Sequence, residues 1–325
     1  MFGKRSARGD LAVAAVADCF GRDVDRSLER IGSIVARARS RGARLVVFPE
    51  SALGGYLWEP KVPGVIDLVG PVPALERDGE HVERLRRIAG ETVVSVGYTE
   101  AALGGGVYSS ALCVSGDGVL GHHRKVHIPP AERGVFLSGD DFEAFDTPVG
   151  RLGMLLCYDK VFPEAARKLS LDGAEIIASM AAWPACRESN TRRLGRDVQT
   201  RRFNVLDQAR AVENQVVWVS ANQVGKLGRL RFPGHAKVVS PEGGVLATTR
   251  SRRGVALAGV DSEGAVSAAR TRISHLGDRR PQAYAALAHG AQPERWSGEH
   301  RALGALAHGA QPERWSGEHA LGTLG

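Results

Sequence analysis

Apolar runs of strand length alternate with amphipathic stretches in this chain, and that alternation restricts its fold more than any other feature. Residues 11–17 and 45–48 are apolar runs, and residues 24–39 between them carry apolar side chains at helical spacing. A second unit follows, with a helix expected at 75–89 and a strand at 92–98. Repetition of strand, helix, strand predicts an α/β layered domain.

Antiparallel strand pairs are expected alongside these units. Residues 107–115 and 119–124 flank an Asp117-Gly118 turn, which predicts a hairpin, and Pro241-Glu-Gly-Gly244 predicts another. Further expected elements are strands at 151–156, 175–179, 216–221 and 236–239, and helices after Phe162 and across 196–213. The predicted sheet is therefore partly parallel and partly antiparallel.

Length and composition fit one large folded domain. The chain has 325 residues, 43% of them hydrophobic, which is enough to bury a sizeable core. Layered α/β domains reach this length as one unit, and no internal linker is evident. We therefore expect one domain at residues 1–285.

The remaining residues, 286–325, form a tail with a duplicated segment. Residues 286–300 recur without change as residues 305–319. Two copies are too few for a solenoid, which needs about three or more stacked repeats. A recent duplication in a disordered tail is the simpler interpretation, and an oligomer arm anchored by Trp296 and Trp315 is the alternative.

The net charge of +7 makes nucleic-acid binding a hypothesis to test against the placement of the basic residues. Many arginines fall within residues 187–210, but Glu188, Asp197 and Asp207 interrupt them, and no series of aromatic residues accompanies them. This pattern favours a solvated helix face or a subunit contact. No nucleic-acid partner is expected.

Neither a signal peptide nor a membrane span is expected. Lys4 and Arg5 precede the apolar run at 11–16, but Asp18 ends that run, which fits a first strand better. No stretch approaches the roughly 18 apolar residues of a membrane span. The four cysteines are widely spaced without a Cys-x-x-Cys pair, which favours reduced thiols and a cytoplasmic protein.

Three short motifs place reactive side chains directly after predicted strands. Glu50 ends Phe-Pro-Glu, Lys125 lies in His-Arg-Lys-Val-His, and Cys157 begins Cys-Tyr-Asp. Cys157 also precedes a predicted helix, whose amino terminus is expected to lower the pKa of the thiol. Each residue alone is more often an ordinary surface or core residue. Together they supply the base, the cation and the nucleophile that acyl transfer needs.

These motifs, in this order and spacing, resemble the nitrilase superfamily of carbon-nitrogen hydrolases over roughly residues 10–284. Gly139-Asp140, residues 209–214, Pro241-Glu-Gly243 and Asp278-Arg-Arg-Pro281 are similar to further landmarks of that family. The resemblance implies a four-layer αββα sandwich that assembles into homodimers or larger homo-oligomers. It also implies a reaction without a metal or an organic cofactor.

The resemblance implies a role for each reactive residue. Cys157 is expected to be the nucleophile, Glu50 the general base and Lys125 the cation that stabilises the oxyanion, with the backbone N–H of Tyr158. Many members of the family have a second glutamate between the lysine and the cysteine. Glu132 stands in that place and is expected to position the substrate and Lys125.

The expected substrate is a small-molecule amide or an N-carbamoyl amine. Tyr158-Asp159 after the cysteine is similar to the amidase and carbamoylase branches, whereas true nitrilases usually have Trp-Glu there. Hydrolysis through a thioester would release ammonia or an amine and a carboxylic acid. Expected walls of the substrate pocket are Tyr56, Trp58, Tyr158 and Trp183, and core packing is the alternative for these aromatic residues.

Other functions remain open at this point. His122, His123 and His127 could be drawn as metal ligands, but adjacent strand residues point to opposite faces, so no metal site is expected. The same acyl-enzyme could hydrolyse a nitrile or transfer its acyl group to an amine. A noncatalytic binding protein is the last alternative, and the presence of all three reactive residues argues against it.

Overall fold

The computed structural model describes residues 11–56, 72–186, 191, 193–228 and 230–284. The chain divides into two units, Met1–Asp278 and Arg279–Gly325. The first unit contains every strand and α-helix described below. The described part of the second unit is residues 279–284, with a 3-10 turn at Pro281–Tyr284. Trp58, Trp296 and Trp315 lie outside the described residues.

One extended sheet runs through the first unit in the order β5-β4-β3-β2-β1-β10-β9-β8-β7. The pairs from β3 through β1 and β10 to β8 are parallel, whereas β4, β5, β7 and β14 join their neighbours antiparallel. The bounds are β1 Leu11–Asp18, β2 Ala43–Val47, β3 Val93–Ala101, β4 Val107–Ser115, β5 Gly118–Arg124, β6 Phe136–Leu137, β7 Ala144–Thr147, β8 Gly150–Leu156, β9 Ile176–Ala181, β10 Val217–Leu227, β11 Leu230–Pro233, β12 Lys237–Val239, β13 Val245–Thr248 and β14 Gly254–Val260.

Five α-helices accompany the sheet in the described part of the chain. Three begin at aspartates that accept backbone N–H groups, as N-caps usually do: Asp23 accepts from Arg26, Asp197 from Gln199 and Asp261 from Gly264. The bounds are α1 Val24–Arg39, α2 Glu80–Ala89, α3 Pro163–Leu171, α4 Val198–Asn214 and α5 Ser262–Arg272.

Side chains of β1 alternate between two hydrophobic cores. Val13, Ala15 and Ala17 belong to the core between the two halves of the sheet, where β4 and β5 face β7 and β8. Ala14 and Val16 point the other way, into the core beneath α1 and α2, as the two-residue period of a strand requires. A third core lies beneath α3 and α4.

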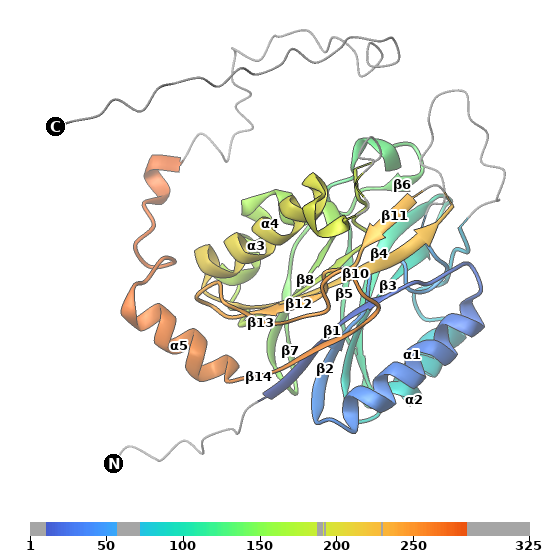
Figure 1. The fold of residues 1–325 in the computed structure, drawn as a ribbon, viewed down its shortest axis with the longest axis horizontal. Helices are drawn as coiled ribbons and strands as arrows, with labels where there is room; N and C mark the ends of the chain where they lie inside the picture. Colours follow the sequence, from blue (N-terminus) through green and yellow to red (C-terminus); the bar gives the residue numbers. More distant parts are fainter. Residues whose placement is uncertain (1–10, 57–71, 187–190, 192, 229, 285–325) are drawn as a thin grey trace, which may run out of the picture. The chain divides into compact units, whose positions relative to one another are not determined.

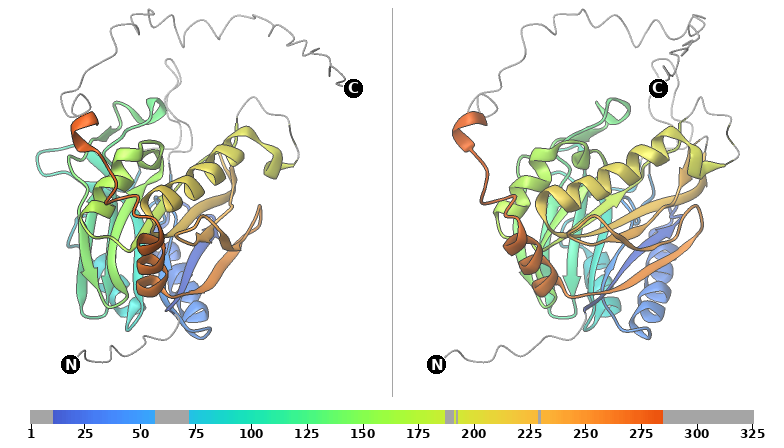
Figure 2. Two further views of the ribbon diagram at one scale, coloured as in Figure 1. Left: turned by 90° about the vertical axis from the view of Figure 1, so that its left-hand side faces the viewer. Right: turned by 60° about the vertical axis from the view of Figure 1, so that its left-hand side comes forward.

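The helices cover both outer faces of this double sheet. Figures 1 and 2 show α1 and α2 on one side of the strands and α3 and α4 on the opposite side. The layers therefore run helix, sheet, sheet, helix, and the predicted four-layer αββα fold is confirmed. Both hairpins are confirmed as well, as β4-β5 and β12-β13.

The helix predicted at 75–89 begins later, at Glu80. Leu75 fits the apolar spacing of a helix, but its backbone pairs with β3: its N–H donates to Thr99 and its carbonyl accepts from Ala101. The prediction was wrong for residues 75–79 because pairing with the sheet outweighs helical spacing there. No helix among the described residues is long and apolar enough to cross a membrane.

Candidate active site

Glu50 follows β2, and groups from two other strands or their ends hold its carboxylate. The hydroxyl of Ser109 donates to Oε1 over 3.0 Å, and the backbone N–H of Ala182 donates to Oε2 over 3.0 Å. Gly97 of β3 permits this arrangement, because a Cβ there would lie 2.6 Å from the Cα of Glu50. The carboxylate is fully buried and fixed in direction.

Lys125 bridges two carboxylates in the interior. Its Nζ donates to Oε1 of Glu50 over 2.8 Å and to Oε2 of Glu132 over 2.7 Å. All three side chains are essentially inaccessible to solvent. The hydroxyl of Tyr56 donates to the other oxygen of Glu132. The structure thus brings together three of the four residues predicted to be catalytic.

Cys157 stands at the point where β8 ends. It begins a 3-10 turn, Cys157–Val161, that leads into α3, and its φ of 46° lies in the left-handed region. Strained backbone of this kind in a non-glycine residue recurs at active sites. The side chain packs in a small cluster with Trp183 and Phe203 and is 6% exposed. Cys157 also lies close enough to Glu50, Lys125 and Glu132 for their charges to act on its thiol, so the fourth predicted residue belongs to the same cluster.

The pKa of the Cys157 thiol is shifted in the opposite direction from the one expected. Burial raises the pKa of its thiol well above the usual value and the carboxylate of Glu50 raises it further, while Lys125 and Lys160 oppose these effects. The prediction that a helix amino terminus lowers this pKa was wrong. The 3-10 turn separates Cys157 from α3, and burial beside a carboxylate disfavours the thiolate.

Lys125 stays charged despite its burial. Desolvation alone would lower its pKa, but the carboxylates of Glu132 and Glu50 outweigh desolvation and raise the pKa well above the usual value. Burial raises the pKa of Glu132, against the effect of Lys125. At neutral pH the cluster therefore presents a protonated thiol beside a fixed ammonium group.

The histidines beside Lys125 bind carboxylates. Asp159 accepts from the side chains of His123 and His127 over 3.2 and 2.9 Å, and from the backbone N–H of His127 over 2.9 Å. Nε2 of His122 lies 2.7 Å from Glu100. Asp159 thereby ties the turn that begins at Cys157 to the loop that carries Lys125. Sequence reasoning missed this bond, although Asp159 belongs to the cysteine motif.

A second feature that sequence reasoning missed is a buried cluster of charged side chains near Cys157. Nζ of Lys160 donates to Asp207 over 2.7 Å and lies 3.3 Å from the centroid of the Phe203 ring. Lys237 ion-pairs with the same carboxylate. These side chains are all buried, and Lys160 acts electrostatically on Cys157. The signal in the sequence was Lys160, which directly follows the Cys-Tyr-Asp motif. A lysine that is buried so close to a predicted site needs a carboxylate partner.

A cavity of about 890 Å³ opens at Cys157. Tyr56, Glu132, Tyr158 and Trp183 line it, so three of the four residues predicted to bind substrate border this space, and the fourth, Trp58, lies outside the described residues. Most of the lining is apolar, and Arg201 and Arg202 at the start of α4 add positive charge. Such a cavity admits a small organic molecule.

Known proteins are similar to this chain in sequence and in fold. Residues 12–270 match the carbon-nitrogen hydrolase family. A nitrilase of Pyrococcus abyssi is 32% identical over 68% of this chain and 78% of its own length. An N-carbamoylputrescine amidase of Solanum lycopersicum is 27% identical over 85% of this chain and 94% of its own.

The solved structures agree with the sequence comparison. A carbon-nitrogen hydrolase from Helicobacter pylori G27 superimposes with a TM-score of 0.74 at 25% identity, covering 87% of this chain and 99% of that one. The match over residues 12–270 includes the whole cluster around Lys125. The chain therefore belongs to the carbon-nitrogen hydrolase family of the nitrilase superfamily, and it is a carbon-nitrogen hydrolase.

Proposed function

We propose that this enzyme hydrolyses a small amide or N-carbamoyl amine through a thioester on Cys157. One observation carries the proposal: a buried lysine held between two glutamates lies beside a cysteine that borders a cavity. A carbonyl carbon placed at the sulfur would meet a base and an oxyanion donor in one site. The relative named N-carbamoylputrescine amidase supports this substrate class.

In the proposed reaction Glu50 takes the thiol proton as the sulfur attacks the carbonyl carbon. Because burial keeps Cys157 protonated, attack requires this base. Lys125 and the N–H of Tyr158 stabilise the oxyanion, and Glu50 returns the proton to the departing ammonia or amine. For an amide, Glu50 then deprotonates a water molecule, which hydrolyses the thioester to a carboxylic acid, and the proton passes to the Cys157 sulfur. For an N-carbamoyl amine, loss of ammonia leaves a thiocarbamate on Cys157, and the same hydrolysis gives a carbamic acid that breaks down to carbon dioxide and the amine.

Glu132 acts in this proposal by positioning Lys125. It accepts from Nζ on the side opposite Glu50 and is itself held by Tyr56. An oxyanion donor contributes most when its direction is fixed before the reaction, and losing one typically costs about 100- to 1000-fold in rate. Two glutamates on one ammonium group provide that fixed direction.

Ammonia release from a panel of primary amides, N-carbamoyl amines and nitriles tests the proposal. Release from amides or carbamoyl compounds is expected for the wild type and should vanish in Cys157→Ala. Cys186→Ala is the matched control, because this second thiol also borders the cavity, and it should still release ammonia. Release confined to nitriles, or retained in Cys157→Ala, would overturn the proposal. Adding an amine and finding a new amide would indicate acyl transfer instead.

A further inference from the structure

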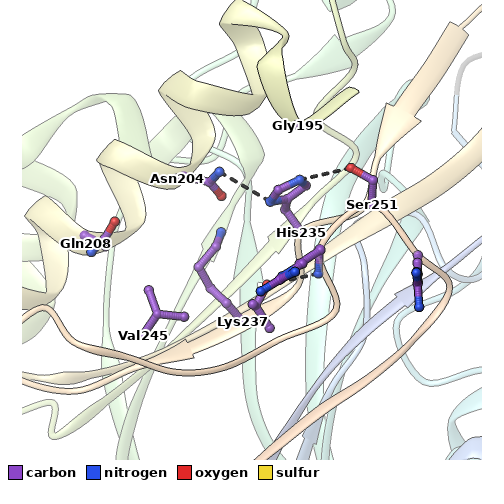
Figure 3. A pocket seen from close by; sticks show the side chains of 10 residues that line it. Gly195, Asn204, Gln208, His235, Lys237, Val245 and Ser251 are labelled. Atoms are coloured by element: carbon purple, nitrogen blue, oxygen red, sulfur yellow. Dashed lines mark hydrogen bonds between the residues drawn. The ribbon is translucent and has the colours of Figure 1, made fainter. Parts of the chain in front are cut away.

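A second cavity lies on the side of α4 that carries Asn204 and Gln208. It has a volume of about 540 Å³ and shares no lining residue with the active-site cavity. Figure 3 shows Asn204 and Gln208 on the helix facing His235, Lys237 and Ser251. Four basic residues are among those that line it: His235, Lys237, Arg250 and Arg252. None of its described lining residues is acidic.

The floor of this cavity carries incompletely balanced positive charge. Lys237 is buried and ion-pairs with Asp207, but Asp207 also accepts from Lys160 over 2.7 Å. Two ammonium groups therefore share one carboxylate. Asp207 is occupied further by Nε1 of Trp218, which donates to it over 2.9 Å. A buried charge without a full counter-charge is costly, so an anion at Lys237 would stabilise the cluster.

The rim carries two arginines without a carboxylate partner among the described residues. Arg250 and Arg252 are exposed and make no ion pair there, whereas their neighbour Arg253 pairs with Asp18 over 2.9 Å. A guanidinium group matches the geometry of phosphate and carboxylate oxygens. The rim and the floor therefore present cations toward the same space.

Hydrogen bonds hold the wall of the cavity in place. Nδ1 of His235 lies 3.3 Å from the amide nitrogen of Asn204, and its Nε2 lies 3.1 Å from the hydroxyl of Ser251. The backbone N–H of His235 donates to the backbone carbonyl of Arg250 over 2.7 Å. These bonds join α4 to the turn between β13 and β14 (Figure 3). The arginines are thus carried by an anchored turn.

Proton affinities in the cavity reflect the same positive potential. Burial, together with the charges of Lys237 and Arg250, lowers the pKa of His235 to about 4. Burial also lowers the pKa of Lys237 to about 8, where Asp207 opposes and Lys160 adds to the effect. A bound anion would raise both values.

We propose that this cavity binds a small dianionic oxyanion, with phosphate and phosphate monoesters as the favoured class. Arg250 and Arg252 would pair with its oxygens at the rim, and Lys237 would face it from the floor. Inorganic phosphate fits easily within about 540 Å³, which leaves room for a small organic group. The inference does not depend on the proposed hydrolytic reaction.

Calorimetric titration of the full chain with inorganic phosphate, at constant ionic strength, tests the site. Saturable binding is expected, with affinity lowered at least tenfold in Arg252→Gln and in Arg250→Asn. Asparagine is chosen at 250 because the φ of 50° there is left-handed, which asparagine tolerates. Both positions are exposed, so the variants should fold. Succinate in place of phosphate shows whether dicarboxylates share the site.

Two matched controls separate this site from others. Arg253→Gln removes the same charge from the adjacent position, and Arg201→Gln removes a cation from the active-site cavity. Neither should weaken phosphate binding. Absence of saturable binding, equal weakening by Arg253→Gln, or weakening by Arg201→Gln alone would overturn the proposal. Chloride binding as tightly as phosphate would do the same.

Discussion

Lys125 is the residue on which the buried cluster depends. Its ammonium group is the shared partner of Glu50 and Glu132, and all three side chains are inaccessible to solvent. Removing one partner of a buried ion pair leaves an uncompensated charge and typically costs about 3–5 kcal/mol. The same substitution also removes the proposed oxyanion donor.

Lys125→Met is therefore expected to lose both activity and stability. We predict a fall in kcat of at least about 100-fold and a lower free energy of unfolding in urea, by about 3–5 kcal/mol. Arg84→Gln is the control, because its pair with Asp25 is largely exposed and should contribute less than about 1 kcal/mol. Equal losses of stability in the two variants would contradict this view of the cluster.

Lys160 acts electrostatically on the thiol of Cys157. Its positive charge lowers the pKa of Cys157 against the effects of burial and Glu50. Lys160→Met removes that charge and leaves Asp207 paired with Lys237, so the fold should persist. The pKa of the thiol should then rise.

Iodoacetamide alkylation of Cys157, followed by mass spectrometry across a pH series, measures that change. The rate profile of Lys160→Met should shift to higher pH than the wild-type profile. Lys168→Met, at a half-exposed lysine of α3 paired with Asp141, should leave the profile in place. A folded Lys160→Met protein with the wild-type profile would show that Lys160 has no influence on the thiol.

At the scale of elements, Asp159 joins the turn after β8 to the loop after β5. Bonds from His123 and His127 outweigh burial and lower the pKa of Asp159 to about 2 from 3.8. A carboxyl group with a lowered pKa stabilises the fold above its unfolded pKa. That stabilisation disappears as pH falls from about 3.8 through about 2.

Asp159→Asn is predicted to be less stable than the wild type at neutral pH, by on the order of 2 kcal/mol. The difference in unfolding free energy should shrink as pH falls through the interval between those two pKa values. Urea unfolding of both proteins at pH 7 and near pH 3 measures it. If the difference in unfolding free energy stays constant or grows as pH falls, the charge of Asp159 does not account for the loss of stability.

The elements that were predictable are those specified by nearby residues. Apolar runs and helical spacing are local, so β1, α1 and β2 were expected from sequence, and the motifs at strand ends placed Glu50, Lys125 and Cys157. In contrast, β14 pairs with β1 from the opposite end of the domain, and no local signal indicates that partner.

Long-range contacts also explain what was missed in the site. Ser109 reaches Glu50 across 59 positions of sequence, and Lys160 reaches Asp207 across 47. Ser109 and Asp207 are ordinary polar residues in the sequence until the fold supplies their partners. The raised pKa of Cys157 likewise follows from burial, which residue order does not reveal.

At the scale of the whole molecule, the duplicated tail is predicted to be dispensable. Every residue of the proposed site lies before residue 285, and the family match ends at residue 270. A chain ending at Tyr284 should keep wild-type kcat and, in analytical ultracentrifugation, the same number of subunits per assembly as the full chain. Loss of assembly on truncation would instead support an oligomer arm with Trp296 and Trp315 as anchors.

The central claim is that Cys157 carries the acyl group during the reaction. Rapid-quench mass spectrometry, with an amide that the enzyme hydrolyses, tests this claim most directly. The predicted result is a mass increase equal to the acyl group on the peptide containing Cys157. It should be absent from Cys157→Ala and should decay as the carboxylic acid appears. Product formation with no adduct at any quench time, or an adduct on Cys186 alone, would contradict the claim.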